Sequence, residues 1–196
     1  MKAILMSIKP KWCEKIFSGE KTVEVRKTAP KEVPFKVYVY ETKTGFIEAV
    51  RDTCPIWAFL RGKVIGEFVC DEKHDIRFTG ASYTINNDIS LTNSIARQSC
   101  LQFDDMFSYL GFKGGAALHI TALKRYDIPK ELSEFRKPDF FRDCEKDCRK
   151  NCDMEYYRCP TRDSHKASTM AGYCRKKGKN LSRPPQSYCY VEEIEE

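Results

Sequence analysis

Six short apolar segments of strand length constrain this chain more than any other feature of its sequence. They lie at residues 3–8, 22–26, 35–41, 62–70, 116–123 and 187–191. Only two stretches show clear helical periodicity, which argues against a βαβ repeat, because that arrangement needs a crossover between successive parallel strands. We therefore expect a mostly β fold of the α+β class, a small β barrel or sandwich with two packed helices.

The two expected helices are marked by the residues at their ends. The first begins at Pro10, because a first helical turn accepts a residue without an N–H, and ends at Gly19, which tolerates a left-handed conformation. The second covers residues 103–110, where apolar side chains recur at helical spacing. In residues 42–61 the apolar residues recur at neither helical nor strand spacing, and residues 71–100 are polar and irregular. No helix or strand is therefore predicted in either stretch.

Length and composition indicate one soluble domain with an insert. The chain has 196 residues, too few for two full domains. No apolar run approaches the ~20 residues that a membrane span needs. The N-terminus has one lysine before a few apolar residues and no cleavage site of a signal peptide, so we expect a cytoplasmic protein without a membrane partner.

Positive charge is concentrated near the N-terminus. The net charge is +6, and residues 1–36 hold nine Lys and Arg against four Glu. Such a surplus suits a phosphate-bearing partner, and it is also common on solvated faces that bind nothing. Charge alone does not decide between these interpretations.

Residues 139–182 differ in composition and are expected to form an insert in a domain made of residues 1–138 and 183–196. Cys, Arg, Lys and Asp dominate the insert, so it cannot bury a core and needs another source of stability. Half of the ten cysteines of the chain lie in it: Cys144, Cys148, Cys152, Cys159 and Cys174. Where thiols stay reduced, such a cluster more often holds a metal than disulfides.

We expect four of these five cysteines to bind zinc, with His165 a weaker candidate ligand. Cys144, Cys148 and Cys152 are spaced at four, so on one straight helix the outer two lie ~12 Å apart, too far for one ion with Zn–S bonds of ~2.3 Å. The helix therefore breaks near Cys152, or only two of the three are ligands. A complete set of thiolates leaves no open position, which makes the zinc structural. The alternatives are reduced cysteines without a metal or one disulfide pair.

Residues 19–26, GEKTVEVR, place an acid and two bases close together. Strand alternation puts two valines on one face and Glu24 and Arg26 on the other. Glu24 and Arg26 can pair with each other, which leaves Lys21 free to contact a phosphate or a nucleobase edge. The alternative is a surface ion pair worth ~0–1 kcal/mol.

Aromatic side chains near this segment offer stacking surfaces. Tyr38 and Tyr40 are expected on the polar side of strand 35–41, and Trp12 lies on the first helix. Stacking of a base on such a ring contributes ~1–3 kcal/mol, so exposed rings beside Lys9 would form a platform for a single strand. Trp12 shares its helical face with apolar residues, which favours a place in the core for that ring.

The pattern G-x-K-x-x-E-x-R of residues 19–26, placed after SIKPKWCEKIFS, resembles the signature of ASCH domains, small barrels related to the PUA fold. Further similarity lies in GKVIGEF, FDDMFSYLG, YDIPKELSEF and RPPQSYCYVEE. Over residues 1–138 and 183–193 the chain is similar to ASCH proteins of bacteria and their phages that carry a cysteine-rich insert before the last strand.

The resemblance implies RNA binding through a cleft beside the signature. The expected ligand is RNA or a nucleotide-like molecule. The residues expected to contact it are Lys9, Lys21, Glu24, Arg26 and Tyr40.

The resemblance also implies a second hypothesis, because one branch of the family hydrolyses the amide of acetylcytidine. Those enzymes are similar at Lys21 and Arg26, and they use a Lys and a Thr on this segment with a Glu from later in the chain. Glu24 stands at the Thr position here, and Lys21 and Glu24 are the catalytic residues expected if the chain is an enzyme. A third hypothesis is a protein-interaction adaptor whose contact surface is the cysteine-rich insert.

Overall fold

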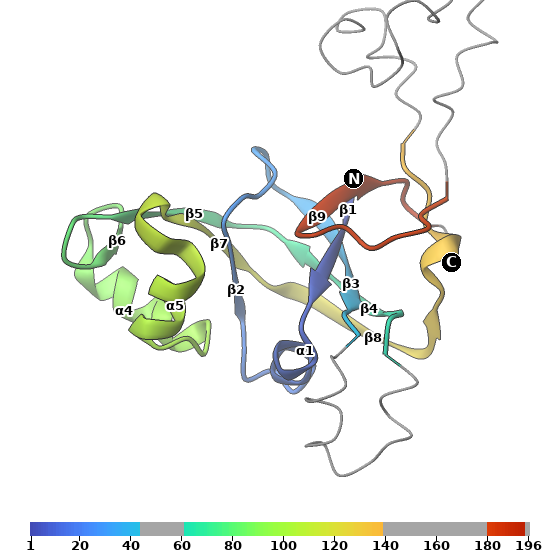
Figure 1. Ribbon diagram of the computed structural model, residues 1–196, viewed down its shortest axis with the longest axis horizontal. Coiled ribbons are helices and arrows are strands. Elements are labelled where there is room, and N and C mark those ends of the chain that lie inside the picture. The colour runs from blue at the N-terminus through green and yellow to red at the C-terminus, as the bar shows by residue number, and fades with distance from the viewer. Residues whose placement is uncertain (44–60, 139–179, 195–196) are drawn as a thin grey trace, which may run out of the picture.

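In the described part of the chain, the strands form two sheets with three α-helices packed around them (Figure 1). The computed structural model describes residues 1–43, 61–138 and 180–194. In chain order the elements are β1 (Lys2–Ile8), α1 (Pro10–Phe17), β2 (Val23–Arg26), β3 (Phe35–Glu41), β4 (Val64–Cys70), β5 (Lys73–Phe78), β6 (Tyr83–Ile85), α4 (Ile89–Gln98), α5 (Phe103–Leu110), η1 (Gly111–Lys113), β7 (Gly115–His119), β8 (Thr121–Lys130), η2 (Leu132–Glu134) and β9 (Tyr188–Val191).

The two sheets have different strand orders. Sheet A runs β8-β4-β3-β1-β9, and sheet B runs β2-β7-β5-β6. β1 and β3 pair in parallel, because α1 and β2 lie between them in the chain and form the crossover that parallel pairing needs. β9 pairs antiparallel with β1, so the C-terminal strand lies beside the N-terminal one.

The inner faces of the two sheets enclose the first hydrophobic core. Ile4 and Met6 of β1, Phe68 of β4 and Leu118 of β7 are completely buried there, and α1 adds Ile16. Helix α1 closes one end of this layer (Figure 1). Successive side chains of a strand point to opposite faces of the sheet, so alternate residues of β1 and β3 line this core.

The expected α+β class is confirmed, but the strands do not close into a barrel. No strand pairing joins the two sheets within the described ranges, and each sheet keeps two edges. The edge strand β6 packs with α4 instead of returning to sheet A, which leaves the sheets as separate layers. Three α-helices are described where two were expected.

Residues 71–100, predicted to be irregular, form β5, β6 and α4, so that prediction is wrong. Ile76, Ile85 and Ile95 of these elements join Met106 and Leu110 of α5 in a second core, on the side of sheet B away from sheet A. Figure 1 shows this helical lobe at the end of the molecule opposite the chain termini.

Helix α4 has a start signal that could have been found in the sequence. The carboxylate of Asp88 accepts a hydrogen bond from the backbone N–H of Leu91 at 3.0 Å, as an N-cap residue does. The interior of the helix contains Ser, Thr and Asn, which interrupt the helical spacing of apolar residues. Hydrophobic periodicity therefore does not reveal this helix.

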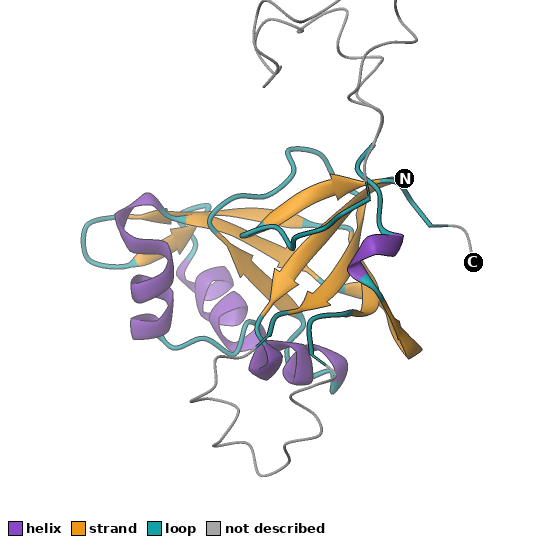
Figure 2. Ribbon diagram, turned by 45° about the vertical axis from the view of Figure 1, so that its right-hand side comes forward, coloured by secondary structure: helices purple, strands orange, loops and turns teal. Residues whose placement is uncertain are grey.

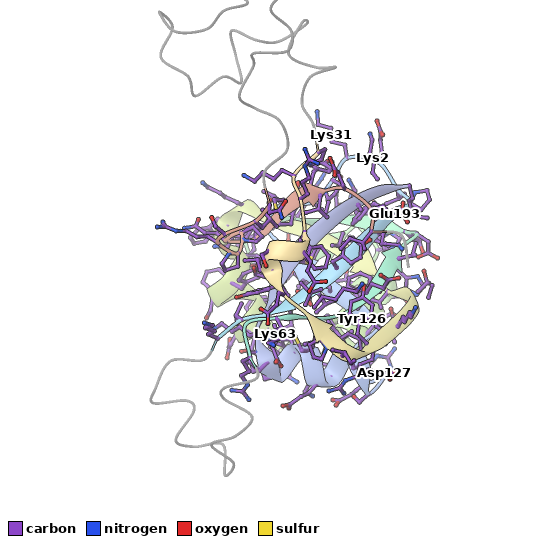
Figure 3. The ribbon with its side chains drawn as sticks, turned by 90° about the vertical axis from the view of Figure 1, so that its right-hand side faces the viewer. Lys2, Lys31, Lys63, Tyr126, Asp127 and Glu193 are labelled. Carbon is purple, nitrogen blue, oxygen red and sulfur yellow. The ribbon has the colours of Figure 1, made fainter. Side chains whose placement is uncertain are left out.

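A third core covers the outer face of sheet A. Phe135 and Leu181 pack there on Tyr38, Tyr40 and other residues of β1, β3 and β4. Figure 2 shows the short helix η2 beside the strands on this side. Tyr126 and Glu193 also lie on this side of the molecule (Figure 3).

The predicted insert at residues 139–182 lies outside the described residues except for its last three. The chain on its two sides is joined by hydrogen bonds. Arg136 and Asn180 form an isolated β-bridge, and Leu181 N donates to Phe135 O at 2.7 Å. The described residues before and after the insert therefore lie side by side. An insertion at this point does not separate the neighbouring strands.

Candidate functional site

Lys21, Glu24 and Arg26 lie close together, and Glu24 contacts both basic side chains instead of leaving Lys21 free as expected. Glu24 Oε2 is 3.3 Å from Lys21 Nζ, and Glu24 Oε1 is 2.9 Å from Arg26 Nε. The Nε–H of Arg26 is not aligned on that oxygen as a hydrogen bond, so the contact is an ion pair without ideal geometry. We call Lys21, Glu24 and Arg26 the buried triad.

The buried triad lies in the interior, with residues 2%, 5% and 6% exposed in chain order. On β2, Glu24 is opposite Leu118 and Arg26 is opposite Ala116, and both partners belong to the core between the sheets. The valines of β2 face the second core on the other side of sheet B. Both faces of β2 are therefore covered, and the triad is not the surface ion pair that its spacing alone would also fit.

Two backbone carbonyls hold the triad from opposite sides. Lys21 Nζ donates to Ser99 O at 2.5 Å, just beyond the end of α4. Arg26 Nη2 donates to Ser7 O at 2.7 Å, on β1 of sheet A. The triad thus connects the helical lobe, sheet B and sheet A. The sequence gives no signal for these two carbonyls, because any residue can supply one.

Burial sets the protonation behaviour of Lys21. Removal from water lowers the pKa of its ammonium, and the neighbouring Glu24 carboxylate opposes that change. Removing one partner of a buried ion pair costs much more stability than removing one partner of an exposed pair. Replacing the whole buried pair with apolar residues of the same volume, however, often leaves the protein no less stable. A buried triad is therefore weak evidence for a stabilising role and is typical of sites with a function.

Trp12 is the aromatic ring closest to the triad. Lys21 Nζ lies 5.1 Å from the ring centroid, and Lys11 Nζ lies 4.4 Å from it. The ring is half-buried and packs against the first core, which agrees with its apolar helical neighbours. Lys9 is exposed one residue before α1, at the N-cap position. Trp12 therefore combines a partly accessible ring with nearby cations.

Tyr40 does not lie with the triad. It is 4% exposed and packs in the third core, on the outer face of sheet A, together with Tyr38. Alternation along β3 is as predicted, but Phe135 and Leu181 cover the face that was expected to be polar and open. The hydroxyl of Tyr38 accepts a hydrogen bond from Ile194 N at 2.9 Å, so the C-terminal segment also shields this face.

Another ionisable group faces the core between the sheets near α1. Glu41 ends β3 opposite Ile8, and burial raises the pKa of its carboxyl group against the opposing effect of Arg61 and Arg125. Its carboxylate also acts on Cys13 of α1, whose pKa is raised mainly by burial. The expectations from the sequence did not include Glu41, which was counted only as the last residue of a strand.

The described ranges hold no group of three or more His, Cys, Asp or Glu side chains that could bind a metal. Cys13, Cys70, Cys100 and Cys189 are free thiols, and burial raises the pKa of Cys70 to about 12. The five cysteines predicted to bind zinc, Cys144, Cys148, Cys152, Cys159 and Cys174, lie outside the described residues. Zinc binding stays a prediction from the sequence.

No protein-family model matches the sequence, and no curated protein matches it. Three solved structures of an ASCH protein from Zymomonas mobilis are similar to the chain. The first has a TM-score of 0.52 at 17% identity and covers 98% of this chain and 89% of its own. Two point variants of that protein score 0.50 at 17% identity and 0.52 at 16% identity, covering 98% of this chain and 92% and 89% of their own.

These similarities show that the chain has the fold of the solved ASCH structures, as the sequence pattern indicated. Among the described residues, no helix is long and apolar enough to cross a membrane.

Proposed function

We propose, from the ASCH fold, that this chain binds single-stranded RNA or a nucleotide-like ligand beside Trp12, with the buried triad underneath. The observation that carries this proposal is the position of the Lys21 ammonium, which is 5.1 Å from the centroid of a half-buried tryptophan while the lysine itself is 2% exposed. A lysine buried in this way is costly, and such cost is typical of binding and catalytic sites.

Trp12 would supply the stacking surface. The Lys11 ammonium, 4.4 Å from the ring centroid, occupies the place that a nucleobase would take. A base that stacks on this ring displaces Lys11 and leaves its charge free for the adjacent phosphate. Lys9, exposed at the start of α1, is placed for a second phosphate.

Glu24 and Arg26 act on the ligand through Lys21 in this proposal. Glu24 holds Lys21 by charge, and Arg26 anchors Glu24 to β1 through Ser7 O. All three members of the buried triad are positioning residues, because residues that are 2%, 5% and 6% exposed offer almost no surface for contact; Lys21 acts on the ligand through the Trp12 ring beside it. Tyr40 takes no part in this proposal, since it lies on the other face of sheet A.

The fluorescence of Trp12 tests this proposal directly. The chain contains two tryptophans, so the Trp57→Phe variant leaves Trp12 as the only source of tryptophan emission. Titration with single-stranded RNA should quench that emission. If about three phosphates are engaged, the affinity should fall roughly 20-fold between about 50 and 200 mM salt.

A matched pair of variants distinguishes RNA binding at this site from nonspecific attraction of RNA to positive charge. Lys11→Gln should weaken RNA binding several-fold, whereas Lys113→Gln, an exposed lysine on η1, removes the same charge and should leave the affinity unchanged. If both variants weaken binding equally, or if RNA does not alter Trp12 emission, the proposed site is wrong.

A second candidate function is hydrolysis of an acylated nucleoside such as acetylcytidine, and the 3.3 Å contact between Lys21 Nζ and Glu24 Oε2 favours it, together with the burial that lowers the pKa of Lys21. In its unprotonated form Lys21 would take a proton from water as the water oxygen attacks the acyl carbon, and would return it to the leaving amine as the C–N bond breaks. Glu24 would keep Lys21 in place. Incubation with acetylcytidine should then release cytidine and acetate, and Lys21→Met should abolish the reaction. Absence of cytidine at every enzyme concentration refutes this candidate.

A further inference from the structure

We propose that the polar pocket between β5 and β6 is a second nucleotide subsite, which extends the RNA contact beyond Trp12. The pocket has a volume of about 420 Å³, within the ~300–1,000 Å³ range of small-molecule sites. Lys73, Asp75 and Arg77 of β5 line it together with Thr84 of β6 and the two asparagines that follow. This inference rests on the proposed function.

The lining groups are polar, and the pocket leaves several of them free for a ligand. Within the described ranges, Arg77, Asp75, Asn86 and Asn87 are exposed and their side chains form no hydrogen bond or ion pair. Lys73 is oriented by the carbonyls of the loop before β3, with Nζ 3.3 Å from both Pro30 O and Lys31 O. The pocket therefore offers a guanidinium, a carboxylate and two amides without partners.

The two asparagines are held in a fixed turn. Asn86 and Asn87 have φ values of 53° and 59°, a pair of left-handed residues typical of a type I′ turn. The turn is closed by a 2.8 Å bond from Asp88 N to Ile85 O. Asp88 then caps α4, which ties the turn to the helix. Because the backbone is fixed on both sides, the amide groups need little ordering when a ligand binds.

This combination of groups suits one nucleotide unit. A guanidinium pairs with phosphate through its planar fork, and Asn side chains pair with the edge of adenine. A carboxylate accepts from an exocyclic amino group of a base. Because Asp75 repels free phosphate while Arg77 attracts it, the pocket favours a nucleotide over inorganic phosphate.

The pocket and the buried triad share one face of sheet B. Across the sheet, Arg26 of β2 is opposite Ala116 of β7, which is opposite Asp75 of β5. Neighbouring strands are ~4.8 Å apart, so the β5 backbone lies about 10 Å from β2. Trp12 lies beside Lys21, before β2 begins, whereas Arg26 ends β2, so an RNA that reaches both sites must also span the length of β2.

The test compares two RNA lengths by fluorescence anisotropy, with labelled adenine oligonucleotides of about three and about twelve nucleotides. Arg77→Gln should weaken binding of the longer RNA about 5- to 10-fold and reduce its salt slope by about 0.7, while binding of the shorter RNA stays unchanged. Asn87→Gly keeps the left-handed conformation and removes the amide, and it should weaken the longer RNA several-fold. Arg97→Gln, an exposed arginine on α4, is the matched control and should change neither affinity.

The outcomes separate this inference from the proposed function. If Arg77→Gln and Asn87→Gly both bind the longer RNA as the parent chain does, while Lys11→Gln binds it more weakly, the pocket is not a subsite and the Trp12 site stands. If the parent chain binds neither RNA, both proposals are wrong. A circular dichroism spectrum equal to that of the parent excludes misfolding as the cause of any loss.

Discussion

Removal of the Glu24 charge should destabilise this protein more than removal of any exposed carboxylate. Glu24→Gln leaves the Lys21 ammonium and the Arg26 guanidinium in an interior where they are 2% and 6% exposed and 3.3 Å and 2.9 Å from the former carboxylate. Loss of one partner of a buried ion pair costs about 3–5 kcal/mol. At about 2–4 °C per kcal/mol for a chain of this size, Tm should fall by roughly 6–20 °C.

Urea unfolding at pH 7, followed by circular dichroism, measures the change in the free energy of unfolding. Glu20→Gln is the matched control, because Glu20 pairs with Lys15 at the surface, where an ion pair is worth ~0–1 kcal/mol. The triple variant Lys21→Met, Glu24→Leu, Arg26→Met should recover most of the loss, because it leaves no unpaired charge in the interior.

If Glu24→Gln costs no more than Glu20→Gln, water reaches Lys21 and Arg26 in solution and the triad is not buried. A large loss in Glu24→Gln together with an equally large loss in the triple variant would instead show that the triad stabilises the fold through its own hydrogen bonds to Ser7 and Ser99.

Three further predictions concern other parts of the chain. Because burial raises the pKa of Glu41, its ionised form destabilises the folded state, so Glu41→Gln should raise Tm at pH 7, and the gain should shrink as the pH falls toward 4.5. Exposed Asp127→Asn is the control, and a gain independent of pH would contradict this prediction. Gly66→Ala should lower stability by ~1–3 kcal/mol in urea unfolding, because the new Cβ would lie 2.4 Å from Lys124 O; unchanged stability would show that β4 can shift there. We also propose that the purified chain carries one zinc ion, which elemental analysis should detect. The double variant Cys144→Ser, Cys148→Ser leaves at most three of the five cysteines and should lose the zinc, while Cys189→Ser keeps it; zinc-free protein with the parent fold would refute this proposal.

The residues that begin and end helices and strands predicted much of the fold. Pro10 and Gly19 delimit α1 and its turn, and the strict alternation after Gly19 predicts β2. Residues 116–123 were expected to form one strand, whereas the chain leaves sheet B after His119 and enters sheet A at Thr121. A change of sheet keeps the apolar pattern continuous, so a period-2 argument does not detect it.

The clustering of Lys21, Glu24 and Arg26 was predictable from the sequence, but their burial was not. Glu24 and Arg26 share one face of β2 and form the expected contact, whereas Lys21, just before β2, contacts Glu24 instead of staying free. Whether their face meets water depends on sheet A and α1, which pack against β2 from elsewhere in the chain. Tyr40 shows the same limit, since Phe135 and Leu181 cover it from distant positions.

The attachment of Lys21 to the end of α4 has a mechanical consequence. The Lys21 side chain bonds to Ser99 O, and the next residue bonds through Thr22 N to Gln98 O at 3.0 Å. A ligand that draws the ammonium outward breaks the first of these links and leaves the helical lobe held by the second. Occupancy beside Trp12 would then be transmitted to α4, and the amides of its last turn would exchange their hydrogens with solvent faster in the bound protein than in the free one.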